Sequence, residues 1–228
     1  MNKPDIHYTD AHTHVPVSDT CARCIVCSAQ PQDWGNIIAL SKQHPNIIPA
    51  IGLHPWYLQD QHSDRWDQLE DILQEHPQCL IGEAGLDKCR QGISPIMEQQ
   101  KALNKQLELA EKYHRPIVLH CCQTWGKLLE TIKNHSHLTY LLHGWNGSEE
   151  MISDYLKYST YFSLGSLSKH WDTAIRQIPI NRLLIESDGR NETLIPMYEK
   201  IGKGLHLSSA DLNQIMINNL DQLINNTL

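Results

Sequence analysis

Short apolar segments recur along this chain, and most of them end in histidine, glutamate or aspartate. We count eight, at roughly Ile6–Ala11, Arg23–Ala29, Ile47–His54, Cys79–Leu86, Pro116–Cys121, Thr139–Trp145, Thr160–Gly165 and Arg182–Asp188. They are rich in Leu and β-branched residues, as buried strands are. Parallel strands are buried on both faces, and the side chains that carry chemistry gather at their carboxyl ends. The pattern therefore predicts a parallel barrel with a functional site at one rim.

Amphipathic helical patterns lie between these segments. Their apolar faces comprise Trp66, Leu69, Ile72 and Leu73 in one helix, Leu103, Leu107 and Ala110 in a second, and Leu212, Ile215, Met216, Leu220, Leu223 and Ile224 in the last. Ser148 should cap one further helix, and Ser208 or Ser209 the last one. Alternating strands and helices imply right-handed crossovers, and eight such units predict an α/β fold, the (β/α)8 TIM barrel.

The first crossover is too short to contain a helix. Only residues 15–22 separate His14 from Arg23, so we expect a bare loop and a missing first crossover helix. This shortening fits a barrel at the small end of the usual size range. We therefore interpret residues 1–228 as a single barrel domain.

Composition narrows the class of protein. Hydrophobic residues make up 40% and charged residues 20%, which is ordinary for a globular protein. No apolar run approaches the roughly 20 residues needed to span a bilayer, and the first residues lack a signal-peptide core, so no membrane partner is expected. Seven Cys is an odd count, and the adjacent Cys121 and Cys122 fit reduced thiols better than a secreted disulfide framework. We expect a cytoplasmic monomer.

The net charge of -7 argues against a generic nucleic-acid binder, because backbone binding normally relies on clustered Lys and Arg. Bound divalent ions would invert the charge at an acidic site. A phosphate ester therefore stays possible as a substrate.

His12 and His14 stand at the end of the first predicted strand. Residues two apart on a strand point to the same face, so these two imidazoles should converge on one point. A His-x-His pair also arises by chance on protein surfaces. Later strand ends strengthen the interpretation, because they supply His54, Glu83, His120, His143 and Asp188.

Imidazoles and carboxylates at one barrel rim suit two divalent ions such as Zn²⁺, Mn²⁺, Mg²⁺ or Fe²⁺. A bridging carboxylate is needed to hold two cations a few ångströms apart, and Glu83 is the best placed for it. Two metals can activate water and clamp both oxygens of a displacement at phosphorus.

Two nearby features have alternative interpretations. Asp10 lies deeper on the face of His12 and His14, where it either fixes a ligand's tautomer or is a buried carboxylate bonded to backbone amides. The run Cys21-x-x-Cys24-x-x-Cys27 is spaced like part of a metal motif, but Pro31 stands where a fourth Cys is expected. We interpret its Cys as small hydrophobic residues of a strand.

In this order the segments resemble the TatD family of metal-dependent hydrolases, within the amidohydrolase-type barrels. The matching segments are Asp10–His14, Ile51–Trp56, Ile81–Asp87, Arg115–His120, Leu142–Ser148 and Leu184–Asp188, with residues 207–223 resembling the closing helix. The resemblance covers nearly the whole chain, and Gly-Glu-x-Gly-Leu-Asp is its most specific part. It implies a (β/α)8 fold with two divalent ions.

The resemblance also implies a role for each strand-end residue. One metal would be bound by His12, His14, Glu83 and Asp188, and the other by Glu83, His120 and His143. The catalytic carboxylates would be Glu83 as the bridge and Asp188, which would orient or deprotonate the attacking water.

This chain departs from the family pattern after His120 and after Asp188. Cys121-Cys-Gln123 stands where an Arg is common, and Gly189-Arg190 where Ala-Pro is common. For substrate binding we therefore consider His54, which could donate to a phosphoryl oxygen, and Arg190, which could replace the missing cation. A hydrogen bond to a loop and an exposed salt bridge are their respective alternatives.

The function implied is a metal-dependent phosphodiesterase, with 3′-end removal from single-stranded DNA as the leading example and a small phosphoester as another substrate. Hydrolysis of another small ester or amide is the runner-up, because the same metal chemistry polarises carbonyl groups. A non-catalytic barrel subunit of a larger assembly is a third possibility, although a scaffold has no need of intact ligands.

Overall fold

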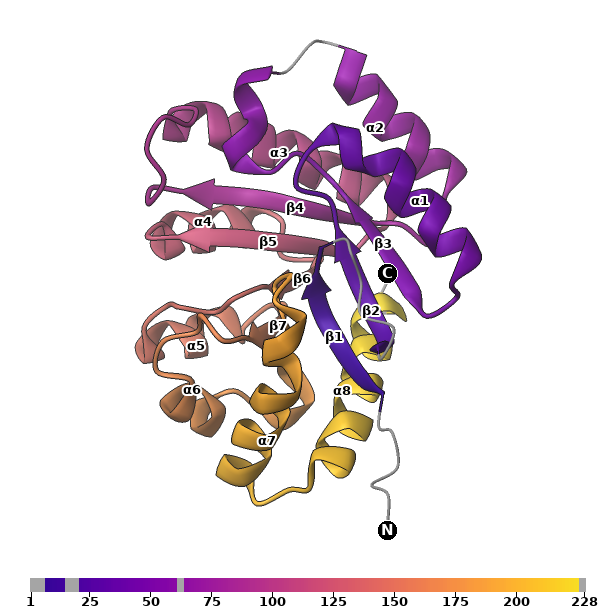
Figure 1. Ribbon diagram of the computed structural model, residues 1–228. Helices are drawn as coiled ribbons and strands as arrows, with labels where there is room; N and C mark the ends of the chain where they lie inside the picture. The colour runs from indigo at the N-terminus through magenta and orange to yellow at the C-terminus, as the bar shows by residue number, and fades with distance from the viewer. Residues whose placement is uncertain (1–6, 15–20, 61–63, 226–228) are drawn as a thin grey trace.

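The structure is a computed structural model that describes residues 7–14, 21–60 and 64–225 (Figure 1). Its strands are β1 (Tyr8–Thr13), β2 (Cys21–Cys27), β3 (Ile47–Ile51), β4 (Leu80–Asp87), β5 (Ile117–Cys122), β6 (Thr139–Leu142), β7 (Ser159–Leu164) and β8 (Leu183–Ile185). They pair in parallel and in sequence order from β1 to β8. The eight parallel strands form the predicted (β/α)8 barrel.

Helices surround the strands on the outside (Figure 1). They are α1 (Trp34–Gln43), α2 (Asp64–Glu75), α3 (Ile96–Tyr113), α4 (Trp125–Asn134), α5 (Glu149–Tyr155), α6 (Trp171–Gln177), α7 (Leu194–Leu205) and α8 (Ser209–Asn225), with 3₁₀ turns η1 (Pro31–Asp33), η2 (Pro55–Asp60), η3 (Ile180–Arg182) and η4 (Asn191–Thr193). Ser208 caps α8, because its hydroxyl accepts the backbone N–H of Asp211 at 3.1 Å. Among the described residues, no helix is both long and apolar enough to cross a membrane.

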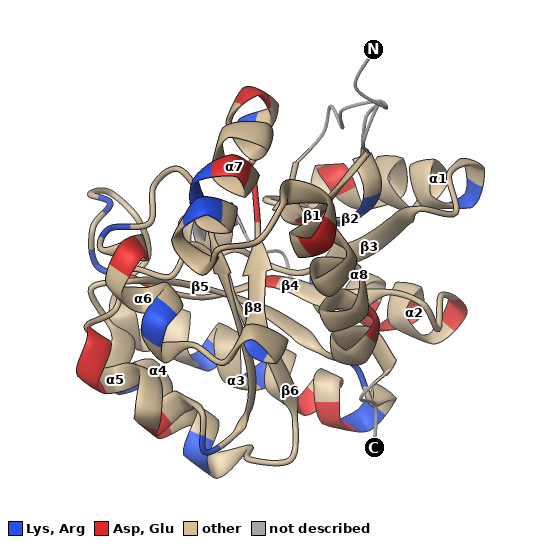
Figure 2. Ribbon diagram, turned by 90° about the horizontal axis from the view of Figure 1, so that it is seen from below, with Lys and Arg blue, Asp and Glu red and all other residues tan. Residues whose placement is uncertain are grey.

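The predicted apolar faces are the ones that pack on the barrel. Leu69 and Leu73 of α2, Leu107 of α3, and Leu212 and Met216 of α8 are all buried in the main core. Both basic and acidic residues lie on the outer helices, so the two charges are spread around the barrel, although α5 and α8 carry acidic residues only (Figure 2).

Hydrogen bonds from residues 187 and 188 join the end of β8 to β1. The backbone N–H of Asp188 donates to the carbonyl of His12 at 3.0 Å. The backbone N–H of Ser187 donates to the carboxylate of Asp10, also at 3.0 Å. Helix α8 lies beside β1 (Figure 1), and Asn213 accepts the backbone N–H of Thr9 at 2.8 Å. These hydrogen bonds join the first strand to the end of the last strand, directly below the rim.

Three strands end three residues earlier than expected. Strand β3 ends at Ile51, β6 at Leu142 and β8 at Ile185, so His54, His143 and Asp188 follow their strands on loops. The predicted bare loop after β1 falls on residues 15–20, which lie outside the described residues.

Candidate active site

Glu83 of β4 lies at the centre of the strand-end cluster and is buried. Gly85 lets β5 approach at this point, because a Cβ there would overlap the carbonyl oxygen of His120 and its φ is +150°. The two oxygens of the Glu83 carboxylate face different groups of imidazoles. This arrangement gives the site two halves.

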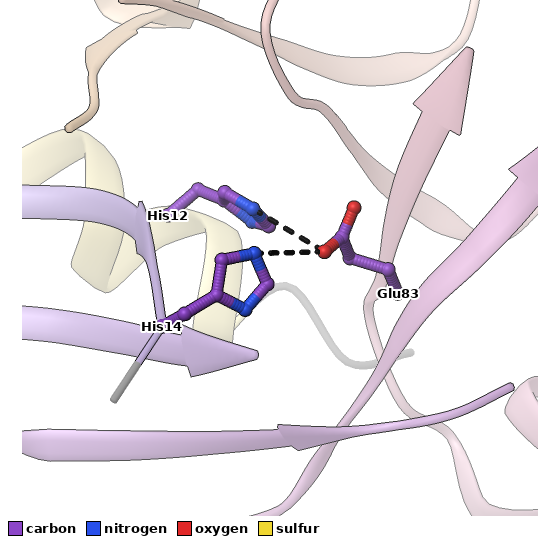
Figure 3. Close-up of side chains that lie close together, drawn as sticks. All are labelled: His12, His14 and Glu83. Carbon is purple, nitrogen blue, oxygen red and sulfur yellow. Dashed lines mark ion pairs between the residues drawn. The ribbon is translucent and has the colours of Figure 1, made fainter. Parts of the chain in front are cut away.

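The first half comes from β1. His12 and His14 point from the same face of β1 toward Glu83 (Figure 3), as the two-residue period predicts. Their Nε2 atoms lie 3.5 Å and 3.2 Å from Glu83 Oε1. Asp188 completes this half, with Oδ1 at 3.5 Å from His12 Nε2 and 3.7 Å from His14 Nε2.

The second half faces Glu83 Oε2. His143 Nε2 is 2.9 Å from this oxygen, His54 Nε2 is 3.5 Å away and His120 Nδ1 is 3.7 Å away. The His143 ring also stacks on His12, with ring centroids 4.0 Å apart. The structure therefore brings together all the predicted strand-end residues.

Outer hydrogen bonds fix which nitrogen of His14 and of His120 faces inward. His14 donates from Nδ1 to the carbonyl of Cys27 at 2.9 Å, which leaves Nε2 toward Glu83. His120 donates from Nε2 to Asp87 Oδ2, also at 2.9 Å, which leaves Nδ1 inward. Such outer hydrogen bonds orient metal-binding histidines and raise their basicity.

Glu186 lies behind His143 in a similar position, but at ion-pair distance and without a hydrogen bond. Its Oε1 lies 3.6 Å from His143 Nδ1, and its Oε2 accepts the hydroxyl proton of Ser163. The carboxylate is buried, and Gly165 makes room for it, because a Cβ there would come within 2.9 Å of Glu186 Cγ. A buried carboxylate behind an imidazole is the partner expected of a ligand histidine.

His54 is in a neutral form with a defined tautomer. Its Nδ1 accepts the backbone N–H of Trp56 at 3.1 Å, so the ring proton is on Nε2, which faces the site. Burial lowers the pKa of His54 to about 3. A neutral imidazole with an inward N–H is a hydrogen-bond donor at any physiological pH.

Asp188 has a left-handed backbone conformation, with a φ of +54°. Aspartate tolerates this region better than most side chains. Burial raises the pKa of the carboxyl, but the nearby His12 imidazole, with Nε2 at 3.5 Å, outweighs it and lowers the pKa to about 2. The group is thus an anion that can accept a proton.

The charges of the cluster depend on one another. Burial opposes the charged forms of Glu83 and His143. The surrounding imidazoles, His12 before His143, hold the pKa of the Glu83 carboxyl well below its usual value, and Glu83 holds the pKa of the His143 imidazole well above its own. Glu83 likewise outweighs the burial of His14 and raises its pKa to about 9. Burial lowers the pKa of His12.

The donor set fits divalent cations. Three groups each bring their ligand atoms within 4.8 Å of one another: His12, His14 and Glu83; His12, His143 and Asp188; and His54, Glu83 and His120. Both ring nitrogens of His12 are buried and have no hydrogen-bond partner, which is rare for buried polar atoms. Mixed imidazole and carboxylate ligands suit Zn²⁺, Mn²⁺ or Fe²⁺.

Two cavities meet at this cluster. The smaller, of about 110 Å³, is lined by His14, Ala29, His54, Trp56, Tyr57, Glu83, His120, His143 and Asp188. The larger, of about 500 Å³, shares four of these residues and extends over the ends of β4 to β8. A substrate in the larger cavity would therefore reach the cluster.

The structure also decides between the alternatives for Asp10 and shows where Arg190 lies. Asp10 is a buried carboxylate bonded to the backbone N–H groups of His12 and Ser187, which is the structural alternative. Arg190 is exposed and is absent from the linings that the described residues give to the two cavities.

The expectation of reduced thiols is wrong at one pair, because Cys89 and Cys122 form a disulfide with their Cα atoms 5.9 Å apart. Parallel pairing of Asp87 with Cys122 brings Cys89 close to Cys122. The two cysteines are 33 positions apart in the sequence, so their contact could not be predicted from it.

Sequence reasoning missed the outer partners Asp87 and Glu186. Glu186 stands two residues before Asp188, and Asp87 closes the Gly-Glu-x-Gly-Leu-Asp segment. Both residues stand in segments that the sequence identifies. Their roles were missed because the histidines that they face belong to other segments.

The outer contact of Glu186 gives a testable prediction. Glu186→Gln keeps the shape but removes the charge behind His143, so affinity for Zn²⁺ should fall about 10–100-fold. Competition with a chromophoric chelator measures the affinity. Glu192→Gln, an exposed position on η4, is the control and should leave it unchanged. Equal affinity in both variants would exclude an orienting role for Glu186.

Comparisons with known proteins agree with this site. The model of the TatD related DNase family matches residues 9–225. An uncharacterized metal-dependent hydrolase of Escherichia coli, YjjV, is 31% identical over 177 residues, which are 73% of this chain and 67% of that protein. The human 3′-5′ RNA nuclease TATDN2 is 32% identical over 148 residues, which are 61% of this chain but 19% of the human protein.

The fold agrees as well. The crystal structure of YjjV, a TatD homolog from Escherichia coli, superimposes with a TM-score of 0.86 at 22% identity, covering 96% of this chain and 98% of that one. Because the family model spans nearly all of the barrel, this chain belongs to the TatD related DNase family of metal-dependent hydrolases.

Proposed function

We propose that this chain is a divalent-metal-dependent phosphodiesterase that removes nucleotides from the 3′ end of a single strand. Family membership supports the hydrolase class, and the human relative named a 3′-5′ RNA nuclease supports the direction of attack. A small phosphoester is the alternative substrate of the same chemistry. Cytoplasmic location, a monomeric state and a single domain over 1–228 stay predictions.

One observation carries the proposal: the two oxygens of Glu83 face separate sets of imidazoles. A carboxylate in this position can bridge two cations. We assign His12, His14, Glu83 and Asp188 to one ion and Glu83, His120 and His143 to the other. Two ions so placed would activate a water and stabilise both oxygens of an in-line displacement at phosphorus.

The chain's own residues have separate tasks in this mechanism. Asp188 is ionised and partly exposed at the junction of the cavities, where it orients the attacking water and accepts its proton. His54 presents its Nε2–H to a phosphoryl oxygen. Asp87 holds His120 in the tautomer that leaves Nδ1 inward, and the Glu186 carboxylate lies behind His143 at ion-pair distance.

A substrate panel tests the proposal. Purified protein supplied with Mn²⁺ or Zn²⁺ should release mononucleotides from the 3′ end of a labelled oligonucleotide and cleave bis-p-nitrophenyl phosphate. A carboxylic ester and an amide are assayed in parallel. Cleavage of the ester or amide alone would support the runner-up function. No turnover of any substrate, with metal bound, would favour the non-catalytic subunit.

A further inference from the structure

Arg90 is the basic side chain of the larger cavity. The described residues lining that cavity include no other Lys or Arg, and the smaller cavity has none. Its volume of about 500 Å³ lies within the roughly 300–1,000 Å³ typical of small-molecule pockets. A cation in a pocket of this size is positioned to bind an anionic ligand.

The position of Arg90 is fixed by several contacts. Its guanidinium carbon lies 4.2 Å from the centroid of the Trp56 ring, a cation–π contact. Its backbone N–H donates to Asp87 Oδ1 at 3.0 Å. The preceding Cys89 is joined to the end of β5 by the disulfide with Cys122. Because these contacts already hold Arg90 in place, binding of a ligand would cost little conformational entropy.

The guanidinium remains available to a ligand. Arg90 is exposed, and no described carboxylate forms an ion pair with it. A planar guanidinium that stacks on an aromatic ring still presents its N–H groups along its edge, where a phosphate can accept two of them.

A chain of contacts connects Arg90 to the cluster. Trp56, beneath the guanidinium, donates its indole N–H to Asp87 Oδ2 at 2.6 Å, and the same oxygen accepts from His120 Nε2. The distance between Arg90 and the reacting centre is therefore set by packed side chains. A ligand that reaches both needs two anionic groups with a fixed separation.

The other charges on the cavity limit this contact to one phosphate. Asp87, Glu186 and Asp188 also line the cavity, and the hydrogen bonds of Asp87 hold the pKa of its carboxyl below the usual value, against the effect of burial. An extended run of phosphates along this wall would meet repulsion.

We infer that Arg90, stacked on Trp56, is an anion subsite that binds one phosphate next to the phosphate being cleaved. The subsite deepens the proposed function and rests on it: the substrate is the end of a strand held through two adjacent phosphates. Arg90 then supplies the anion contact that the sequence analysis predicted for Arg190.

Binding of small nucleotides tests the subsite apart from catalysis. With Mn²⁺ present, calorimetry compares thymidine 3′,5′-bisphosphate with the 3′- and 5′-monophosphates. In the unchanged protein, the bisphosphate should bind about tenfold or more tightly than either monophosphate, because it adds one charge-assisted contact. Arg90→Ala should abolish this difference and Arg90→Lys should restore part of it. Arg176→Ala, an exposed change on α6, should preserve it.

Each contrary result has a distinct meaning. An equal affinity for all three nucleotides, or a bisphosphate preference that persists in Arg90→Ala, would overturn the subsite even if oligonucleotides are cleaved. A preference lost in Arg190→Ala instead would move the contact to Arg190. A preference that depends on Arg90 in a protein that cleaves no oligonucleotide would keep the subsite and overturn the nuclease proposal.

Discussion

Replacing Glu83 is expected to remove both metal ions and nearly all activity. The Glu83 carboxylate faces His14 Nε2 at 3.2 Å through one oxygen and His143 Nε2 at 2.9 Å through the other, so its loss affects both halves of the site. Affinity should fall by more than the roughly 10–100-fold that an outer partner costs. Metal analysis of the washed protein, before and after saturation, measures the loss.

His54→Ala is the matched comparison for Glu83→Ala. His54 contacts the same carboxylate but has a neutral ring with a proton on the inward nitrogen, so its removal should cost fewer ions. Glu83→Gln, which is isosteric, is measured beside Glu83→Ala to separate metal loss from misfolding, with circular dichroism as the check. Retention of two ions per chain in folded Glu83→Gln would show that Glu83 is not the bridge.

Asp188→Asn is expected to lower kcat with the fold intact. The Asn side chain keeps the shape but cannot accept the proton of the attacking water, and it binds a cation more weakly. Loss of a general base costs on the order of 10²–10⁴ in rate. Steady-state kinetics at saturating metal, with an oligonucleotide and with bis-p-nitrophenyl phosphate, measure the effect.

Asp10→Asn is the control for Asp188→Asn. Both are aspartates at the junction of β1 and β8, but Asp10 accepts the backbone N–H groups of His12 and Ser187 and lines neither of the two cavities. Its buried carboxyl has a pKa raised to about 7, so a neutral amide should be tolerated there. Near-normal kcat in Asp188→Asn would assign the water to another group, whereas an equal fall in both variants would indicate a general structural effect.

Local patterns predicted the barrel and the positions of its strands. The two-residue period of β1 was sufficient to place His12 and His14 on one face, because side-chain direction in a strand is set by the backbone alone. Glu83 and Asp188 could be placed because the carboxyl ends of parallel strands meet at one rim.

Contacts between different strands were harder to predict. The tautomer of His120 depends on Asp87 at the end of the neighbouring strand, and the carboxylate behind His143 is Glu186, which follows β8, two strands away from β6. Arg90 joins the cavity because Asp87 and Trp56 fix the loop after β4, and no period in the sequence describes a loop. Arg190 is close to Asp188 in sequence, but the left-handed conformations at Asp188 and Gly189 turn the chain there.

The contacts between β1 and the C-terminal part of the chain also determine when in folding the site can form. Ser187 and Asp10 are 177 positions apart, and Thr9 and Asn213 are 204 apart, so these contacts must close very long loops. Contacts between such distant residues cost the most chain entropy and tend to form late. His12 and His14 are synthesised before Asp188, and they meet it only after the strands between them have been made. The proposed catalytic aspartate therefore joins the histidines late in folding, and hydrolysis should be confined to barrels in which the first and last strands have joined.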